Sequence, residues 1–369
     1  MGFRTIFAAL LAFASLAAQA NSNLVVNVSL PVRTAVGDRE VLVNVTFTNT
    51  GDLPIRMVNW LLPDAELDAD MFLLSRDGEP VTYLGPIVKR APPAAQDMIT
   101  LAPGESISRI VDLAGVYDLT VSGVYSIQYG VASSHLFTPV IHARREDAFR
   151  EDRLQSSIGA NQLLSNEVLT WVDGRKMAPI DAAQASLAGD APLAANNASS
   201  IAYTGNCSTA EQSTIVSAVA AASTMTNGAV SYLSGQPSAT QRYTTWFGAY
   251  SSANWGEVEG HFVNLKDALD TKPLTVDCKC KKKYYAYVFP NQPYKIYVCN
   301  AFWSAPLTGT DSKGGTLIHE LSHFTVIAGT DDFAYGQTAA KQLAITDPAK
   351  ARFNADSHEY FAENTPTLP

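Results

Sequence analysis

The chain has 369 residues, of which 47% are hydrophobic and 17% are charged, and its formal net charge is -9. This length predicts two or three domains with well-developed apolar cores, and the composition is typical of neither a disordered nor a membrane-embedded protein. The mild excess of acidic residues also argues against nucleic acid as a partner.

The first 20 residues have the features of a signal peptide. Arg4 supplies the positive end, an apolar run extends from Ile6 to Leu16, and Ala18-Gln-Ala20 forms a small-residue cleavage site. The alternative, a membrane anchor, is disfavoured because this run is shorter than the roughly 20 apolar residues of a spanning helix. We therefore expect a secreted, extracellular chain that begins near Asn21 and has no contact with a membrane.

Alternating apolar and polar residues run from Asn23 to about Val140. A period of two indicates half-buried strands, and we expect strands at 106–113 and 123–131 among others, separated by turns rich in Pro, Gly and Asp. Residues 21–140 are therefore predicted to form an all-β, immunoglobulin-like sandwich. Tyr125 fits either the tyrosine corner of such a fold or an ordinary core position.

The composition changes over residues 141–200. A charged run at 144–153 is followed by a stretch rich in Ala, Ser, Asp and Asn, which cannot bury much apolar surface. This segment is interpreted as a linker with one helix at about 161–172. Linkers are common sites of proteolytic cleavage, so a processing site is expected here.

Residues 201–369 are predicted to form an α+β domain with helices around a small sheet. The first helix should cover Thr209–Leu233, with Thr209 or Ser208 as its N-cap ahead of Glu211. A segment dense in Tyr, Val and Phe indicates a hairpin at 274–303. Further helices are expected at 255–269, at 312–327, from about 335, and at 355–363.

All four cysteines lie in this second domain. In an oxidising compartment they indicate two disulfides rather than a metal cluster. Cys278 and Cys280 flank one residue of a predicted strand, so their side chains share a face and are too constrained to bond each other. Each needs a distant partner, and we favour Cys207–Cys278 and Cys280–Cys299. The alternative is a Cys-x-Cys metal site.

The motif His319-Glu-Leu-Ser-His323 lies on a predicted helix. Its two histidines are four residues apart and project from one face, while Glu320 borders the same cleft, which is typical of a zinc site with its own base. Catalytic zinc uses three protein ligands and a water, so one ligand must come from outside the helix. Asp331 and Asp332, in a loop bounded by glycines, are the best candidates.

Together with Gly329-Thr-Asp-Asp-Phe-Ala-Tyr-Gly336, this motif resembles the aspzincin metallopeptidases, the deuterolysin group. Within that group the chain is most similar to the peptidyl-Lys metalloendopeptidases and to the secreted toxic aspzincins of Gram-negative bacteria. For residues 21–200 the resemblance implies only an N-terminal propeptide. It covers about residues 201–369 and includes the segments 203–207, 242–248, 301–306, 308–311 and 354–364.

The resemblance also implies roles for the site residues. The family pattern places the third ligand nine residues after the second histidine, which selects Asp332 and completes a site for one Zn²⁺ per chain with His319 and His323. Glu320 would take a proton from the attacking water and pass it to the leaving amine. Tyr335 would donate to the developing oxyanion, with an ordinary packed tyrosine as the alternative. The same resemblance supports the two disulfides.

Asp356 and Glu359 are three residues apart on the last predicted helix, so their carboxylates lie side by side. Two such carboxylates repel each other unless a cation joins them, and a lysine ammonium is a compact match. In peptidyl-Lys enzymes an Asp and a Glu at corresponding places bind the lysine on the leaving side of the bond. Cleavage before lysine is therefore expected. The alternative is a solvated acidic face.

Only two lysines occur between residues 21 and 200. Lys176 lies in the predicted linker, and we expect the enzyme to cut itself there and free its catalytic domain. Lys89 lies in an expected loop and is interpreted as a surface lysine, with an inhibitory plug in the acidic pocket as the alternative.

These features predict a monomeric, secreted zinc endopeptidase that is made as a zymogen, acts on protein or peptide substrates and contacts its own prodomain. One alternative is a broad-specificity, deuterolysin-like neutral protease. Another is a secreted adhesion module with a vestigial zinc domain, although Glu320 and Asp332 are both present and argue against it.

Overall fold

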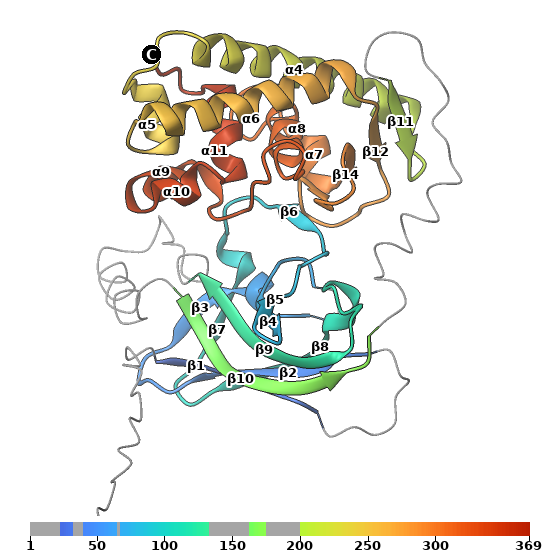
Figure 1. The fold of residues 1–369 in the computed structure, drawn as a ribbon, viewed down its shortest axis with the longest axis vertical. Coiled ribbons are helices and arrows are strands. Elements are labelled where there is room, and N and C mark those ends of the chain that lie inside the picture. The colour runs from blue at the N-terminus through green and yellow to red at the C-terminus, as the bar shows by residue number, and fades with distance from the viewer. Residues whose placement is uncertain (1–22, 32–39, 65–66, 133–161, 175–199) are drawn as a thin grey trace, which may run out of the picture.

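The computed structural model describes residues 23–31, 40–64, 67–132, 162–174 and 200–369. These residues form two units, a strand-rich unit up to residue 174 and a unit of helices and strands from residue 200 (Figure 1). The expected signal peptide, Lys176 and most of the expected linker lie outside the described residues.

The N-terminal unit consists of antiparallel strands, which confirms a strand-rich region. The sheets have the orders β1-β2-β8, β10-β9-β4-β5 and β3-β7. In β1, Leu24, Val26 and Val28 are buried while the residues between them are exposed, and the inward faces of these sheets share one apolar core. The elements are β1 (Leu24–Ser29), β2 (Leu42–Asn49), β3 (Ile55–Val58), η1 (Asn59–Leu61), β4 (Phe72–Arg76), β5 (Glu79–Pro80), β6 (Ile87–Lys89), η2 (Ala95–Asp97), β7 (Met98–Leu101), β8 (Ser106–Asp112), η3 (Leu113–Gly115), β9 (Gly123–Ala132) and β10 (Gln162–Val172).

The prediction of a helix at about 161–172 is wrong, because these residues form strand β10, which pairs antiparallel with β9. Its register shifts between Leu164 and Glu167, and a bulge of this kind inserts an extra residue into the alternation. The bulge interrupts the period of two that identified the other strands. The N-terminal unit therefore extends to Val172, and this part of the expected linker belongs to a sheet.

The C-terminal unit is a mixed sheet covered by helices. The strand order is β11-β12-β14-β13-β6, in which β11, β12 and β14 are parallel and β13 is antiparallel to both of its neighbours. The elements are β11 (Ile201–Thr204), α4 (Thr209–Leu233), α5 (Gln241–Phe247), α6 (Ser252–Thr271), β12 (Leu274–Asp277), β13 (Ala286–Val288), β14 (Lys295–Val298), α7 (Asn300–Ser304), α8 (Lys313–Ser322), α9 (Gly336–Thr346), α10 (Pro348–Ala351) and α11 (Ala355–Glu363).

Most of the helices expected in this unit are present. Helix α4 has the expected bounds, and Ser208 is its N-cap in a reciprocal capping box with Glu211. Helix α8 is shorter than expected, and the region 274–303 contains a β13–β14 hairpin with β12 parallel to β14. Along the described part of the chain, no helix combines the length and the apolar character needed to cross a membrane.

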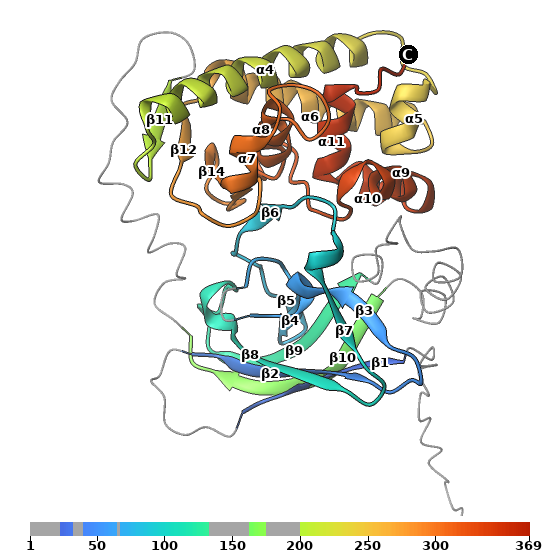
Figure 2. The ribbon, with the colours of Figure 1, turned by 180° about the vertical axis from the view of Figure 1, so that it is seen from behind.

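Strand β6 connects the two units. It belongs to the N-terminal half of the chain, yet Lys89 pairs with Ala286 and Val88 pairs with Tyr287 on β13. Figures 1 and 2 show this segment reaching from the strand-rich unit to the unit above it. Because β13 would otherwise be an open sheet edge, β6 supplies its missing hydrogen-bonding partner.

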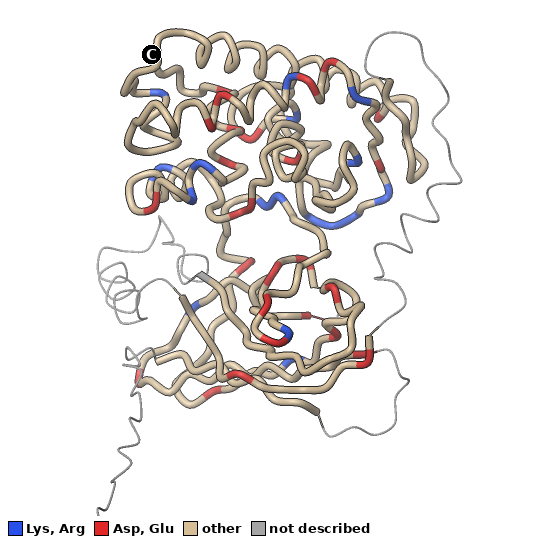
Figure 3. Tube along the Cα trace, in the orientation of Figure 1, with Lys and Arg blue, Asp and Glu red and all other residues tan. Residues whose placement is uncertain are grey.

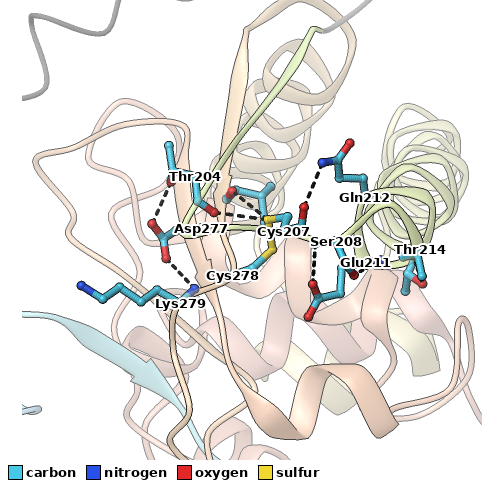
Figure 4. The surroundings of a disulfide bond; sticks show 11 residues. Thr204, Cys207, Ser208, Glu211, Gln212, Thr214, Asp277, Cys278 and Lys279 are labelled. Carbon is cyan, nitrogen blue, oxygen red and sulfur yellow. Dashed lines mark hydrogen bonds between the residues drawn. A yellow bond between two sulfur atoms is a disulfide. The ribbon is translucent and has the colours of Figure 1, made fainter.

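Both favoured disulfides are present. Cys207 is bonded to Cys278, and Cys280 is bonded to Cys299. In Figure 4 the first disulfide joins the start of α4 to the end of β12, next to hydrogen bonds of the Asp277 carboxylate. No free cysteine remains among the described residues, so a Cys-x-Cys metal site is excluded.

Candidate active site

Helix α8 carries His319 through the interior of the C-terminal unit, and His323 is its C-cap residue. Its N-cap is Ser312, whose hydroxyl accepts a hydrogen bond from the Gly315 amide at 2.9 Å, and all residues of the helix are buried. Gly315 lets α11 come close, because a Cβ there would lie 2.1 Å from the Glu363 carboxylate and 3.0 Å from the Glu359 side chain. This close approach places the acidic residues of α11 beside His319.

The three expected metal ligands converge. The Asp332 Oδ1 atom lies 3.1 Å from His319 Nε2 and 3.7 Å from His323 Nε2. All three side chains are buried, and their ligand atoms lie within 4.8 Å of one another. Asp331 is not part of this group: its carboxylate accepts the Asp332 amide, and its backbone pairs with Asn354.

Neighbouring groups orient both imidazole rings. His323 Nδ1 is hydrogen-bonded to the Thr330 carbonyl oxygen at 2.9 Å, and His319 Nδ1 makes an ion-pair contact of 2.9 Å with Asp356 Oδ1. A ring that donates through Nδ1 keeps Nε2 free as a ligand atom. Both Nε2 atoms therefore face Asp332.

The residues present fit a zinc ion. Both Nε2 atoms and Asp332 Oδ1 are buried and lack a hydrogen-bond partner, which an ion held between them would provide. Burial lowers the pKa of His323 to about 4 and so favours the neutral, ligating form. Burial also acts to lower the pKa of His319, but the Asp332 carboxylate outweighs it and raises that pKa well above its usual value. The pKa values of the two histidines therefore shift in opposite directions.

Glu320 lies beside this group without a partner of its own. Both of its carboxylate oxygens are buried and lack a hydrogen bond. Burial, supported by the carboxylates of Asp332 and Glu359, raises the pKa of Glu320 well above its usual value despite the opposing effect of His319. Such a carboxylate has the proton affinity expected of a general base.

The Tyr335 hydroxyl makes two contacts at this site. Its hydroxyl lies 3.1 Å from the Val88 carbonyl oxygen of β6 and 3.2 Å from Asp332 Oδ2. Burial raises the pKa of Tyr335 well above its usual value, so the hydroxyl remains a hydrogen-bond donor. It therefore reaches a peptide carbonyl directly next to the candidate metal ligands.

Asp356 and Glu359 line a buried acidic pocket rather than a solvated acidic face. The Lys89 ammonium lies 3.3 Å from Asp356 Oδ1, 2.5 Å from Glu359 Oε2 and 3.8 Å from Asp311 Oδ1. Burial acts to lower the pKa of Lys89, but these three carboxylates outweigh it and raise that pKa well above its usual value. The pocket therefore holds a charged lysine.

The interpretation of Lys89 as a surface lysine is therefore wrong. Its side chain is 1% exposed, and its strand is inserted between the two units, where the basic residues of the β6 segment lie near acidic residues of the upper unit (compare Figures 1 and 3). The contacts of Lys89 instead match the alternative considered from the sequence, a lysine that occupies the acidic pocket.

Several residues of this arrangement were not predicted from the sequence. Asp311 lies in the segment 308–311, which supported the family resemblance without a role, and its carboxylate accepts a hydrogen bond from Tyr360 at 2.7 Å. Next to Lys89, the Arg90 guanidinium pairs with Asp68 at 2.8 Å and lies 4.3 Å from the centre of the Tyr284 ring. The sequence signal for the role of Arg90 was its position next to Lys89 in a basic dipeptide.

Comparisons with known proteins place these residues in context. The family described as lysine-specific metallo-endopeptidase, the aspzincins, matches residues 232–363. An extracellular protease of Aeromonas hydrophila is 46% identical over 328 residues, 89% of each chain. A peptidyl-Lys metalloendopeptidase of Grifola frondosa is 35% identical over 375 residues, 99% of each chain. Among solved structures, a zinc peptidase from Grifola frondosa is 48% identical, with 44% of this chain and 100% of that chain covered and a TM-score of 0.43.

Proposed function

Because the chain belongs to the aspzincin family of zinc metalloendopeptidases, we propose that it cuts peptide bonds on the amino side of lysine. We also propose that it is made as a monomeric zymogen, in which the strand-rich unit is an immunoglobulin-like prodomain that blocks the active site. In this proposal, His319, His323 and Asp332 hold one zinc ion per chain.

The pose of β6 supports both proposals. The Lys89 side chain enters the acidic pocket, while the carbonyl of Val88 accepts a hydrogen bond from Tyr335. The peptide bond between these two residues thus lies where a bond to be cut would lie, with lysine on the leaving side. The pairing of β6 with β13 adds a strand to a sheet edge, a common way to bind an extended peptide.

The burial of the pocket would give strong selectivity. The side chains of Asp356 and Glu359 are at most 1% exposed, so a neutral side chain in place of lysine would leave two carboxylates unpaired in the interior. Removing one partner of a buried ion pair costs about 3–5 kcal/mol. That cost corresponds to a preference for lysine of more than about a hundredfold.

The catalytic roles follow from the same geometry. Zinc held by the three ligands would polarise the peptide carbonyl and lower the pKa of a bound water. Glu320, buried and without a partner, takes the proton of the attacking water and delivers it to the leaving amine. Tyr335 donates its hydroxyl to the carbonyl oxygen, where negative charge develops.

Contacts outside the pocket would hold the prodomain in place. Arg90 is paired with Asp68 within the N-terminal unit and packs over Tyr284 of the C-terminal unit, so it fixes β6 to both.

One hydrogen bond supports the proposed immunoglobulin-like fold of the prodomain. The Tyr125 hydroxyl donates to the Val121 carbonyl at 2.6 Å, a bond of the tyrosine-corner type found in immunoglobulin-like folds.

We propose that the zymogen is secreted through its signal peptide and activates itself by cutting before Lys176. The two disulfides and the extracellular relative from Aeromonas hydrophila are consistent with an oxidising, extracellular location. A cut there would break the chain between the two units described above.

The test uses purified full-length wild type and Glu320→Gln. Wild type should cut itself to give N-termini at Lys176, and at Lys89 if β6 is also hydrolysed, whereas Glu320→Gln should keep its zinc and stay intact. Equally fast processing of purified Glu320→Gln would assign the cut to another protease.

Specificity is measured by digestion of a denatured protein with the activated enzyme, followed by mass spectrometry of the new N-termini. Lysine should dominate these N-termini. A spread over many residue types would instead support a broad-specificity neutral protease. Glu359→Gln is the matched variant, and it should reduce the preference for lysine more than it reduces zinc content.

A further inference from the structure

Two carboxylate oxygens of α11 each face a metal-site histidine and the lysine ammonium. Asp356 Oδ1 lies 2.9 Å from His319 Nδ1 and 3.3 Å from Lys89 Nζ. Glu359 Oε2 lies 3.3 Å from the same histidine nitrogen and 2.5 Å from the same ammonium. The same two atoms therefore line the lysine pocket and support a proposed zinc ligand.

These oxygens cannot exchange one partner for water. The side chains of Asp356, Glu359, His319 and Lys89 are each at most 1% exposed. The second oxygen of Asp356 is fixed by the Gly336 amide at 2.6 Å, directly after Tyr335 in the chain. Because charges buried in this way are poorly screened, a change at one partner must affect the other.

The ammonium is expected to weaken zinc binding rather than strengthen it. A carboxylate that accepts the Nδ1 proton of a histidine makes Nε2 a better metal ligand. An ammonium that binds the same oxygens competes for their lone pairs and neutralises their charge, so it weakens that support.

We propose that Asp356 and Glu359 couple the lysine pocket to the metal site, such that a lysine in the pocket lowers the affinity for zinc. The inference rests on the zinc ligands and the lysine pocket of the proposed function. Because coupling between two binding events is reciprocal, zinc also lowers the affinity of the pocket for lysine. Zinc loading therefore favours the release of Lys89 from the zymogen.

The experiment measures the zinc dissociation constant of the full-length chain by competition with a chelator. Every variant carries Glu320→Gln, so that the chain is not cut. Lys89→Met replaces the ammonium with an apolar side chain and should increase the zinc affinity about fivefold or more. Lys272→Met is the control, because it removes a cation that pairs with Asp267 on the surface, away from β6, and should change the affinity by less than about twofold.

Two further measurements separate the ammonium from a general loosening of β6. n-Butylamine added to Lys89→Ala, whose shortened side chain vacates the pocket, should restore the weaker zinc binding. Asp356→Asn should lower zinc affinity by about ten- to a hundredfold, and Lys89→Met should then have a smaller effect than it has with Asp356 present.

Unchanged or weaker zinc binding in Lys89→Met would overturn the coupling, as would an equal increase in Lys272→Met. The N-termini produced in digestion decide the lysine specificity independently. A failure of the coupling can therefore be distinguished from a failure of the proposed function.

Discussion

Replacement of Tyr335 by phenylalanine separates binding from catalysis. The change removes one hydroxyl, which lies 3.1 Å from a peptide carbonyl oxygen and 3.2 Å from Asp332 Oδ2. A hydrogen bond to a neutral carbonyl contributes about 1 kcal/mol, whereas loss of one donor to a developing oxyanion costs about 2.7–4 kcal/mol, or about a hundred- to a thousandfold in kcat. We therefore expect kcat to fall by that factor while KM changes only a few-fold.

The assay follows hydrolysis of a lysine-containing peptide by enzyme released from the full chain through limited proteolysis. Zinc is kept saturating, because Asp332 also loses a neighbour in this variant. Tyr297→Phe removes a hydroxyl elsewhere in the same unit, where it lies 3.5 Å from Gln292, and should leave kcat unchanged. A kcat of Tyr335→Phe near the wild-type value, or a loss seen only in KM, would refute the proposed oxyanion contact.

Two further predictions concern the metal site and its surroundings. Asp332→Asn should strongly reduce the zinc content, measured by atomic absorption, while Asp331→Asn should retain it. The reason is that only Asp332 faces both histidines. Similar losses in the two variants would contradict the ligand assignment. Burial raises the pKa of Glu363 from the usual 4.5 to about 8, so its contribution to stability is complete below about pH 4.5 and is lost as the pH rises through about 8. Glu363→Gln keeps an acceptor for Ser312 but cannot titrate. The unfolding temperature of wild type should therefore fall relative to that of the variant between these pH values. A constant difference between the two unfolding temperatures would contradict this pKa.

Much of the candidate site could be predicted because its signals are local. The four-residue spacing of His319 and His323 places them on one face of any helix, and the three-residue spacing of Asp356 and Glu359 does the same on α11. The choice between Asp331 and Asp332 needed the family pattern, because both lie in one short loop. The structure separates them by direction, since only Asp332 turns towards the histidines.

Features that depend on contacts between distant segments could not be predicted in this way. Strand β10 was missed because a bulge breaks the period of two. The lysine pocket shows the limit most clearly, since Lys89 meets Asp356 and Glu359 across 267 and 270 residues. No periodicity, cap or spacing rule spans such a distance.

The sequence by itself therefore indicated which residues form the candidate zinc site. Only the tertiary structure shows that a lysine of the same chain occupies the pocket beside it. The spacing of His319, Glu320 and His323 places them around one cleft on a helix, and of the two cysteine pairings left open by the sequence the favoured one is present. Only the packing of the two units reveals that β6 fills the site with a lysine of the same chain. The physical reason is that burial of an ammonium among carboxylates is a property of the folded interior, which no local stretch of sequence contains.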